Sequence, residues 1–401
     1  MGSLATWQLA AAALVLGWPA QAAKPDAAPA PRTIALERLW TIGGESEAEG
    51  EVFGIILDLA VDREGRVYLL DTRLSELRVF SPDGEYLRTI GREGEGPGDL
   101  FRPQRVAAMP DGSLCVTQFS PPRCSRFSPD GEYLGELALA DSLDRGERTV
   151  FVVAGVGEQR VVETIDLIRT ERYNESSSMI RRIDAGGRES SRIAASTPRR
   201  FVYGERRFRE LGNMPFRWSL APNGVVYLVK DFGDDIEVWG PEGALRRVVD
   251  CGYAHRMRSD EELATRRSAF GSGPQALQPE LMDYDPDIQW LSAAQDGRLW
   301  VMSSQGRDAG GAESLGIFDV FGPDGRLEER IQLRGAGRLP EDRFFLQGDR
   351  LFVLSGRAAV LRDRPAGARN ADGAAESPSD EEDDDLPPGV VCYRVPGEAF
   401  R

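Results

Sequence analysis

Short apolar runs of four to six residues alternate with turn residues along most of the chain. Between residues 57 and 90, the runs LDLAVD, VYLLD, LRVF and YLRTI are separated by polar steps, two of which contain Gly. Val, Ile and Tyr favour strands, and Gly accepts the positive φ of tight hairpin turns without steric cost. This unit therefore predicts a four-stranded antiparallel sheet.

The unit repeats along the chain. The octapeptide FSPDGEYL occurs at 80–87 and again at 127–134, and fainter copies with SLAPNG at 219–224 and SAAQDG at 292–297 keep the same order of runs and turns. Each such sheet has two apolar faces that it cannot bury alone. A spacing in the forties with four strands per unit is typical of propeller blades, which cover these faces by radial stacking.

The pattern predicts an all-β fold, a six-bladed β-propeller of four-stranded antiparallel blades over residues 32–401. The sixth unit lacks a clear fourth strand, and the segment 33–43 ends in TIG just as the first unit does at 89–91. We therefore expect the N-terminal strand to complete the last blade and close the ring. The predicted blades cover 53–91, 104–140, 150–196, 214–252, 288–334, and 342–396 plus 33–43.

The linker between the first two units carries a family resemblance. TIGREGEGPGDLFRP at 89–103 resembles the NHL-type linker of six-bladed propellers, in which a Gly-rich loop is followed by an acidic-aromatic step and a Pro. The resemblance covers about 35–400 and is strongest in the first two units. It implies the six-bladed fold, but it implies no activity, because propellers carry many functions.

The N-terminus predicts export. The apolar run LAAAALVLGW at 9–18 is too short to span a bilayer and is followed by an Ala-x-Ala ending at Ala22. We expect a signal peptide over 1–22, a linker over 23–31 and a periplasmic or secreted protein. The absence of Lys and Arg from residues 1–8 leaves a mis-assigned start codon as the alternative. No later segment is long and apolar enough to span a membrane.

Two insertions interrupt the repeat. Residues 253–287 contain SDEE at 259–262, a capping box that predicts a short helix, and could form a lid or docking element over one face. The alternative is an excursion packed on its own blade. Residues 363–388 are acidic and nearly free of large apolar side chains, so we expect a disordered loop there.

Charge and composition exclude several functions. A net charge of −16 argues against nucleic-acid binding, and a single histidine, His255, removes any multi-His metal site. His255 has no evident partner in the sequence. Cys115 and Cys124 flank a Pro-Pro turn, and in an exported protein they predict a disulfide within one hairpin. A pairing of Cys251 with Cys392 is a second hypothesis.

Alignment of the units indicates a candidate ligand site at the channel entrance. It places one residue of each inner strand at an equivalent position: Asp58, Arg105, Val152, Arg217, Trp290, and either Asp342 or Arg343. Arg105 and Arg217 could clamp a carboxylate or phosphate, and Trp290 could stack on a flat ligand. The alternative is a set of mutually paired charges that line a wet channel.

The functional prediction is a non-catalytic binding or scaffold module. Its partner would be an extracytoplasmic protein or peptide, a glycan or a small anion, and no catalytic residue or metal ligand is assigned. The alternative is a calcium-dependent hydrolase or lyase similar to the gluconolactonase and paraoxonase propellers. The aligned positions depart from that pattern, because they supply more Arg than carboxylate.

Overall fold

The computed structural model describes most of the chain. The described residues are 29–119, 122–137, 139, 147–196, 199–202, 207–209, 217–230, 232–268, 278–311, 313–335, 342–355 and 388–400. The predicted signal peptide over 1–22 lies outside them, as does nearly all of the acidic insertion over 363–388. The Pro-Pro turn between the two hairpin cysteines is described only in part.

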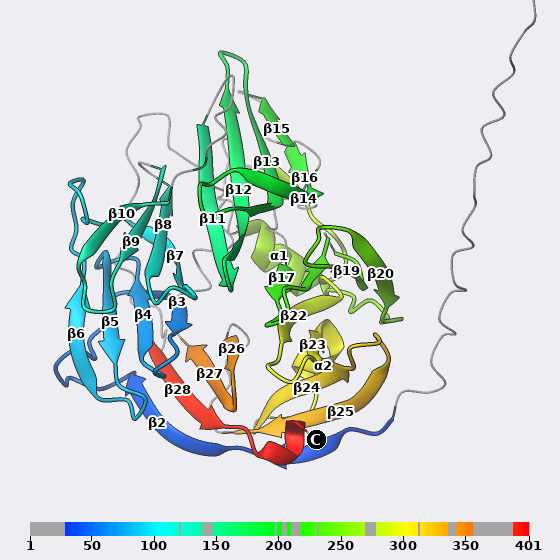
Figure 1. Cartoon of the computed structure of the whole chain (residues 1–401). Coiled ribbons are helices and arrows are strands. Elements are labelled where there is room, and N and C mark those ends of the chain that lie inside the picture. Colours follow the sequence, from blue (N-terminus) through cyan, green and yellow to red (C-terminus); the bar gives the residue numbers. More distant parts are fainter. Residues whose placement is uncertain are drawn as a thin grey trace, which may run out of the picture.

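Six sheets stand around a common axis, as predicted (Figure 1). Blade one consists of β3 (Ile56–Val61), β4 (Val67–Asp71), β5 (Glu76–Phe80) and β6 (Tyr86–Ile90). Blade two consists of β7 (Pro103–Ala108), β8 (Leu114–Phe119), β9 (Pro122–Phe127) and β10 (Tyr133–Glu136). Blade three consists of β11 (Glu147–Val156), β12 (Gln159–Arg169), β13 (Tyr173–Ile183) and β14 (Glu189–Ala195). Blade four consists of β17 (Arg217–Leu220), β18 (Val226–Val229), β19 (Asp235–Trp239) and β20 (Leu245–Asp250). Blade five contains β22 (Ile288–Ala293), β23 (Leu299–Ser303), β24 (Ser314–Phe321) and β25 (Leu327–Arg334).

The sixth blade joins the two ends of the chain, which confirms the predicted closure. It consists of β26 (Arg343–Gln347), β27 (Arg350–Ser355), β28 (Gly389–Arg394) and β2 (Glu37–Gly43), and β2 runs antiparallel to β28. The expectation of one strand over 33–43 needs a correction. The first part forms a separate strand, β1 (Arg32–Ala35), which pairs in parallel with β25 and adds a fifth strand to blade five.

The repeated octapeptide makes the turn between the third and fourth strands. In the first two blades, Gly84 and Gly131 have φ of 86° and 96°, and their amides donate to Ser81 and Ser128 at 3.0 Å. A Cβ on Gly84 would approach the Trp40 ring to 2.8 Å. Glycine is therefore required here for the backbone conformation and for the close contact with the closing strand.

The hydrophobic core is divided among the blade interfaces. Six clusters of buried side chains each span two neighbouring blades of the described chain. Between blades one and two, for example, Tyr68 and Leu70 pack with Val116 and Phe127. Because each sheet buries its faces only against its neighbours, no blade has a core of its own, which is the reason that the repeat predicts a closed ring.

A hydrogen bond also links neighbouring blades at every interface, between residues of their first or second strands. Three of these bonds use a backbone acceptor and three use a side-chain acceptor, and the two kinds follow no regular order around the ring. The pairs, taken around the ring, are Val106 N to Asp58 (3.0 Å), Thr117 to Phe151 O (2.9 Å), Trp218 to Glu163 (3.0 Å), Ala293 N to Ser219 (3.0 Å), Trp290 to Phe344 O (2.7 Å) and Arg343 to Leu57 O.

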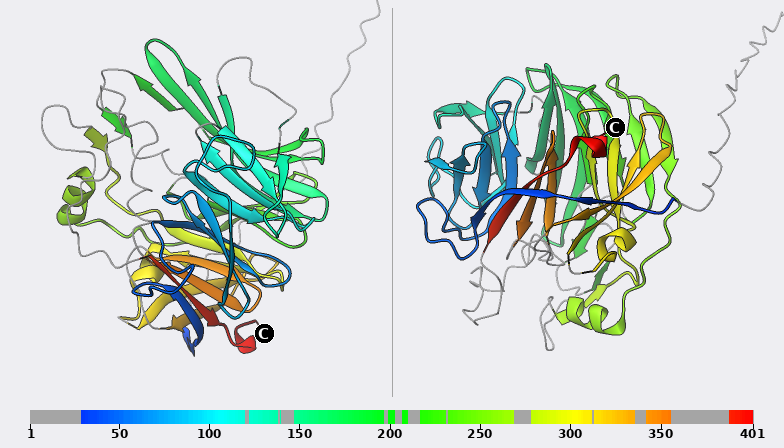
Figure 2. Two further views of the ribbon diagram at one scale, coloured as in Figure 1. Left: turned by 90° about the vertical axis from the view of Figure 1, so that its left-hand side faces the viewer. Right: turned by 90° about the horizontal axis from the view of Figure 1, so that it is seen from below.

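Additional elements extend blades three to five along one face (Figure 2). The strands β12 and β13 are 11 residues long, and β15 (Arg199–Val202) pairs with the far part of β13. The next connection pairs β16 (Arg207–Arg209) in parallel with β21 (Gln278–Glu280) of the insertion 253–287. This insertion is therefore tied to the connection before blade four, and is not packed on its own blade alone.

The predicted capping box forms and starts a helix in this insertion. The Glu262 amide donates to Ser259 Oγ at 3.1 Å, and the Ser259 amide donates to the Glu262 carboxylate at 2.7 Å. The helix α1 (Asp260–Ser268) follows. A second, short helix, α2 (Ser304–Asp308), connects β23 to β24. No helix in the described part of the chain is long and apolar enough to cross a membrane.

Candidate functional site

Strand register places the six aligned inner-strand residues at the same level of the ring. Asp58, Arg105, Val152 and Trp290 each directly follow a register shift in their strand. Their partners on the second strands, together with those of Arg217 and Arg343, are Leu70, Thr117, Glu163, Met302, Val229 and Leu354. The register also resolves the open choice in blade six in favour of Arg343 over Asp342.

Two of the predicted ligand residues take part in contacts between blades. Asp58 is buried, and its carboxylate accepts the Val106 amide of blade two. Trp290 donates to the Phe344 carbonyl of blade six, and its ring meets Phe318 edge-on at 5.6 Å. These contacts position both side chains through the architecture of the ring, and their ligand roles stay predictions.

The three arginines belong to alternate blades. Arg105 stands in blade two with its guanidinium 4.7 Å from the centre of the Phe151 ring, and Arg343 stands in blade six and donates to the Leu57 carbonyl. Both side chains thus reach the inner strand of the next blade. Arg217 of blade four is half-buried. A guanidinium carries five N–H donors, so one backbone bond leaves most of them for other acceptors.

His255 has a partner that the sequence did not reveal. Its Nδ1 lies 2.8 and 3.0 Å from the two carboxylate oxygens of Asp287, which directly precedes β22. The side chain of Asp287 is 1% exposed, whereas that of His255 is 53% exposed. When the imidazole is neutral, Nδ1–H donates to the carboxylate and the lone pair is on Nε2.

The surroundings shift the pKa of both members of this pair. The hydrogen bond to Asp287 raises the pKa of His255, and the charges of Asp287, Asp234 and Asp283 add to that effect. Burial raises the pKa of Asp287, the bond from His255 and the nearby charge of Arg217 oppose this, and Asp234 acts with burial. Arg217 therefore lies close enough to this pair to affect it electrostatically.

Aromatic contacts orient the imidazole. The His255 ring stacks on Tyr284 with centroids 4.1 Å apart and planes 24° apart. Tyr284 in turn meets Phe232 edge-on at 5.8 Å. The imidazole is thus fixed on one side by a carboxylate and on one face by a phenol ring.

An ion-pair network anchors the segments that carry this pair. Arg256 binds Asp285, Glu262 and Asp308, at 2.7, 2.7 and 2.5 Å. Arg258 is buried and binds Asp285 at 2.7 Å. Because Asp308 belongs to α2, this network fastens both ends of the insertion to blade five.

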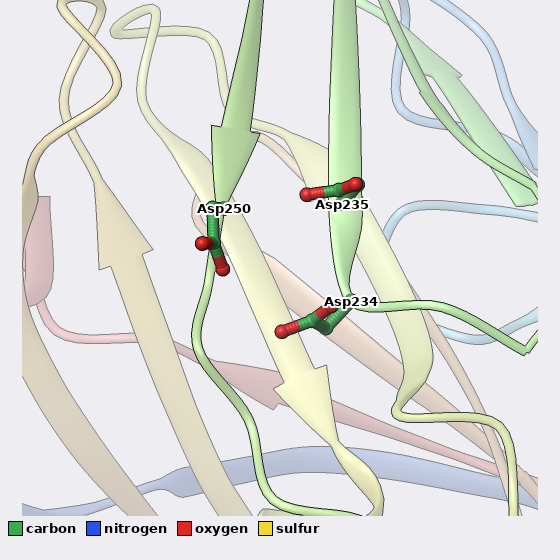
Figure 3. Close-up of side chains that lie close together, drawn as sticks. All are labelled: Asp234, Asp235 and Asp250. Carbon is green, nitrogen blue, oxygen red and sulfur yellow. The ribbon is translucent and has the colours of Figure 1, made fainter. Parts of the chain in front are cut away.

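A third group of charges lies in the outer half of blade four (Figure 3). Asp234, which directly precedes β19, Asp235 at the start of β19 and Asp250 at the end of β20 have carboxylate oxygens within 4.8 Å of one another. Burial and the charges of Asp234 and Asp250 raise the pKa of Asp235. Since β19 and β20 are the outer strands of the blade, this acidic group is not part of the ring of inner-strand residues.

Cys115 and Cys124 are both buried free thiols and belong to the cluster between blades two and three. Cys115 pairs with Arg126 and Cys124 with Thr117, so the two side chains lie diagonally on one face of the hairpin. The thiols hydrogen-bond, which lowers the pKa of Cys115 and raises that of Cys124. The predicted disulfide stays a prediction.

We expect mild oxidation of the purified protein to join Cys115 to Cys124 and to raise the free energy of unfolding by about 2–3 kcal/mol, since the bridge closes a short loop of the unfolded chain. The measurements are the mass of the linked peptide without reduction and urea unfolding with and without dithiothreitol. Cys115→Ser should remove both the link and the response to dithiothreitol. Separate peptides after oxidation would contradict the pairing.

Comparisons with known proteins agree with the architecture. A family model described as a 6-bladed beta-propeller matches residues 53–147. No curated protein sequence matches the chain. The NHL type of the repeat stays a prediction.

Solved structures similar to this chain are distant in sequence. They include a member of the duf4221 family from Bacteroides vulgatus, with 11% identity, 90% of this chain and 97% of that chain covered and a TM-score of 0.47. A gluconolactonase from Xanthomonas campestris has 12% identity, 90% and 87% coverage and a TM-score of 0.41. A streptogramin B lyase has 10% identity, 89% and 96% coverage and a TM-score of 0.40. The activities named belong to those proteins.

Proposed function

We propose that this chain is an exported propeller that binds a small anion at the entrance of its channel. The observation that carries the proposal is the position of Arg105, Arg217 and Arg343 at one level of the inner ring, in alternate blades. Three guanidinium groups at one level of the ring offer several charged donors to a carboxylate or phosphate. Because the chain as a whole has a net charge of −16, three arginines at one level of the ring favour a role in binding an anion.

The neighbouring residues support binding at this level. Asp58 accepts the Val106 amide through one carboxylate oxygen and is the single acid among the six aligned positions, which hold three arginines. A channel lined by cations with low-dielectric walls focuses the field and attracts anions. An anionic side chain of a peptide or an acidic glycan would use the same donors as a free anion.

The proposal is tested with citrate and inorganic phosphate as probes, at constant ionic strength, by calorimetric titration and thermal shift. We expect citrate to bind and to raise the melting temperature. Arg105→Ala combined with Arg217→Ala should weaken binding at least about a hundredfold, because each charge-assisted hydrogen bond contributes about 1.5–3 kcal/mol. Arg246→Ala is the matched control, since Arg246 is exposed on the outer strand of blade four and pairs with Glu242.

Equal citrate affinity in the double variant and the wild type would overturn the proposal, as would a wild type that binds neither probe. The alternative function, a calcium-dependent hydrolase or lyase, would require carboxylates around the axis. In the described part of the chain Asp58 is the one carboxylate among the six aligned positions. A thermal shift with calcium that is reversed by EDTA would favour the alternative.

A further inference from the structure

We propose that His255 and Asp287 form an acid–base dyad that hydrolyses small uncharged carboxylic esters on the face above blades four and five. The proposal concerns an activity, goes beyond anion binding and does not require it. It is carried by three features of the described residues: a buried carboxylate, an imidazole bound to it through Nδ1, and a half-exposed imidazole ring.

The buried carboxylate determines which nitrogen of the imidazole can act. Both oxygens of Asp287 lie within 3.0 Å of Nδ1, so the proton of the neutral imidazole is on Nδ1 and Nε2 is the base. An isolated ion pair on a protein surface has two exposed partners. Here the carboxylate is buried and fixed by its position before β22, which holds the ring in one orientation and stabilises the imidazolium when it forms.

The position of the dyad in the fold makes it rigid. The Ala254 carbonyl accepts a hydrogen bond from Gln305 of α2 at 3.0 Å, and Arg256 binds Asp308 of the same helix. The backbone amide of Asp287 donates to the Phe232 carbonyl at 3.1 Å. Residues on both sides of the dyad are therefore held to blades four and five, as positioning of a proton-transfer group requires.

The charges around the dyad select the substrate class. The charges of Asp287, Asp234 and Asp283 act on His255, and Arg217 acts on Asp287, so the acids outnumber the cation and disfavour an anionic substrate at this point. The stacked rings of His255 and Tyr284 provide a flat aromatic surface for an apolar group. An uncharged ester with an aromatic or apolar portion meets both conditions, and water is the only co-reactant that its cleavage needs.

The reaction proceeds in two proton transfers. A water molecule attacks the ester carbonyl while Nε2 of His255 takes its proton, so a C–O bond forms and a tetrahedral intermediate results. The bond to the leaving alkoxide then breaks, and Nε2–H returns the proton to that oxygen. The products are a carboxylic acid and an alcohol, and the dyad ends as it began. A positioned general base of this kind accelerates such a step by about 10²–10⁴.

The test measures hydrolysis of 4-nitrophenyl acetate across the pH range. We expect saturable, multiple-turnover release of nitrophenol that rises with pH through the pKa of His255, because only the unprotonated imidazole acts as the base. Since Asp287 raises this pKa, the midpoint should lie above the ordinary value for histidine, about 6.5. His255→Gln should reduce kcat by at least about a hundredfold without unfolding the protein, because the ring is half-exposed.

Two carboxylate variants separate the dyad from general electrostatics. Asp287→Asn should reduce kcat at least about tenfold and lower the pH midpoint of the reaction. Asp283→Asn removes a neighbouring charge but leaves Nδ1 bound to Asp287. It should lower the pH midpoint slightly and keep kcat within about twofold. Because the chain has one histidine, the rate of its modification by diethylpyrocarbonate gives the same pKa independently.

Several outcomes would overturn the proposal. One is a rate that rises in proportion to the ester concentration without saturation and equals the rate with free imidazole. The others are an unchanged rate in His255→Gln, and a pH midpoint that Asp287→Asn does not change in a folded protein. The ester probe carries no charge, and citrate contains no ester group. Loss of ester turnover with citrate binding intact therefore contradicts the dyad alone, and the reverse result contradicts the proposed function alone.

Discussion

A chain that begins at Gly44 loses most of its free energy of unfolding, compared with one that begins at Ala23, because the ring can no longer close. The shorter chain lacks β1 and β2, which bury Ile34 and Ile42 and contribute the Trp40 ring to the interface with blade one. Burial of each large apolar side chain contributes about 1.5–3 kcal/mol, and a whole domain has only about 5–15 kcal/mol.

The measurement is urea unfolding followed by tryptophan fluorescence, with size-exclusion chromatography to detect association through the uncovered β28. A chain that begins at Glu37 separates the two strands. It keeps β2 and loses only β1, so it should remain folded and lose about 2–3 kcal/mol, chiefly from Ile34. Equal stability of the chains that begin at Ala23 and Gly44 would show that β2 does not hold the ring closed.

Arg182→Met is the point substitution for which we expect the largest loss of stability. Arg182 is buried in blade three and donates to the Gly224 and Gly240 carbonyls of blade four at 2.6 and 3.1 Å. Burial lowers the pKa of this guanidinium. Met fills a similar space but leaves the Gly224 carbonyl without its donor, whereas the Gly240 carbonyl keeps the Gly243 amide. An unpaired buried acceptor costs about 1–3 kcal/mol and a lost bond from a charged group about 1.5–3 kcal/mol, so we expect a loss of about 3–5 kcal/mol in urea unfolding.

Arg192→Met is the matched control, because Arg192 stands on the next strand, is exposed and pairs with Glu189 at the surface. It should change stability by less than about 0.5 kcal/mol. Arg182→Lys should fall between the two, since one ammonium cannot reproduce the fork of donors. Wild-type stability in Arg182→Met would mean that water replaces the guanidinium at this interface.

The amino-acid sequence was sufficient to predict the repeating part of the fold. Each blade depends on contacts between strands that follow one another, and the turn residues and apolar runs that determine them are adjacent in the chain. The closing strand was predictable for the same reason, since TIG at 41–43 repeats the end of an outer strand that is visible elsewhere. The register of the inner strands also followed from aligned turns, which is why the six aligned positions stand at one level.

Elements that do not repeat were not predictable in this way. β1 joins blade five in parallel, and β16 pairs with β21 across two connections, so neither pairing has a counterpart in another unit. The partner of His255 was missed because the two residues are far apart in sequence. One signal was available: His255 and Asp287 stand near the two ends of one insertion, and those ends must come together where adjacent blades meet.

The closing strand β2 is made near the start of synthesis, whereas its partner β28 is made near the end. Ile42 of β2 pairs with Val390 of β28, so nearly the whole chain must be made before this contact can form. Closing a loop of this length costs about 3 kcal/mol more entropy than closing a ten-residue hairpin. Completion of the ring is thus expected to be a late and slow event of folding. Until then an apolar segment stays without its neighbour, which makes the nascent chain dependent on protection from aggregation in a way that the finished ring is not.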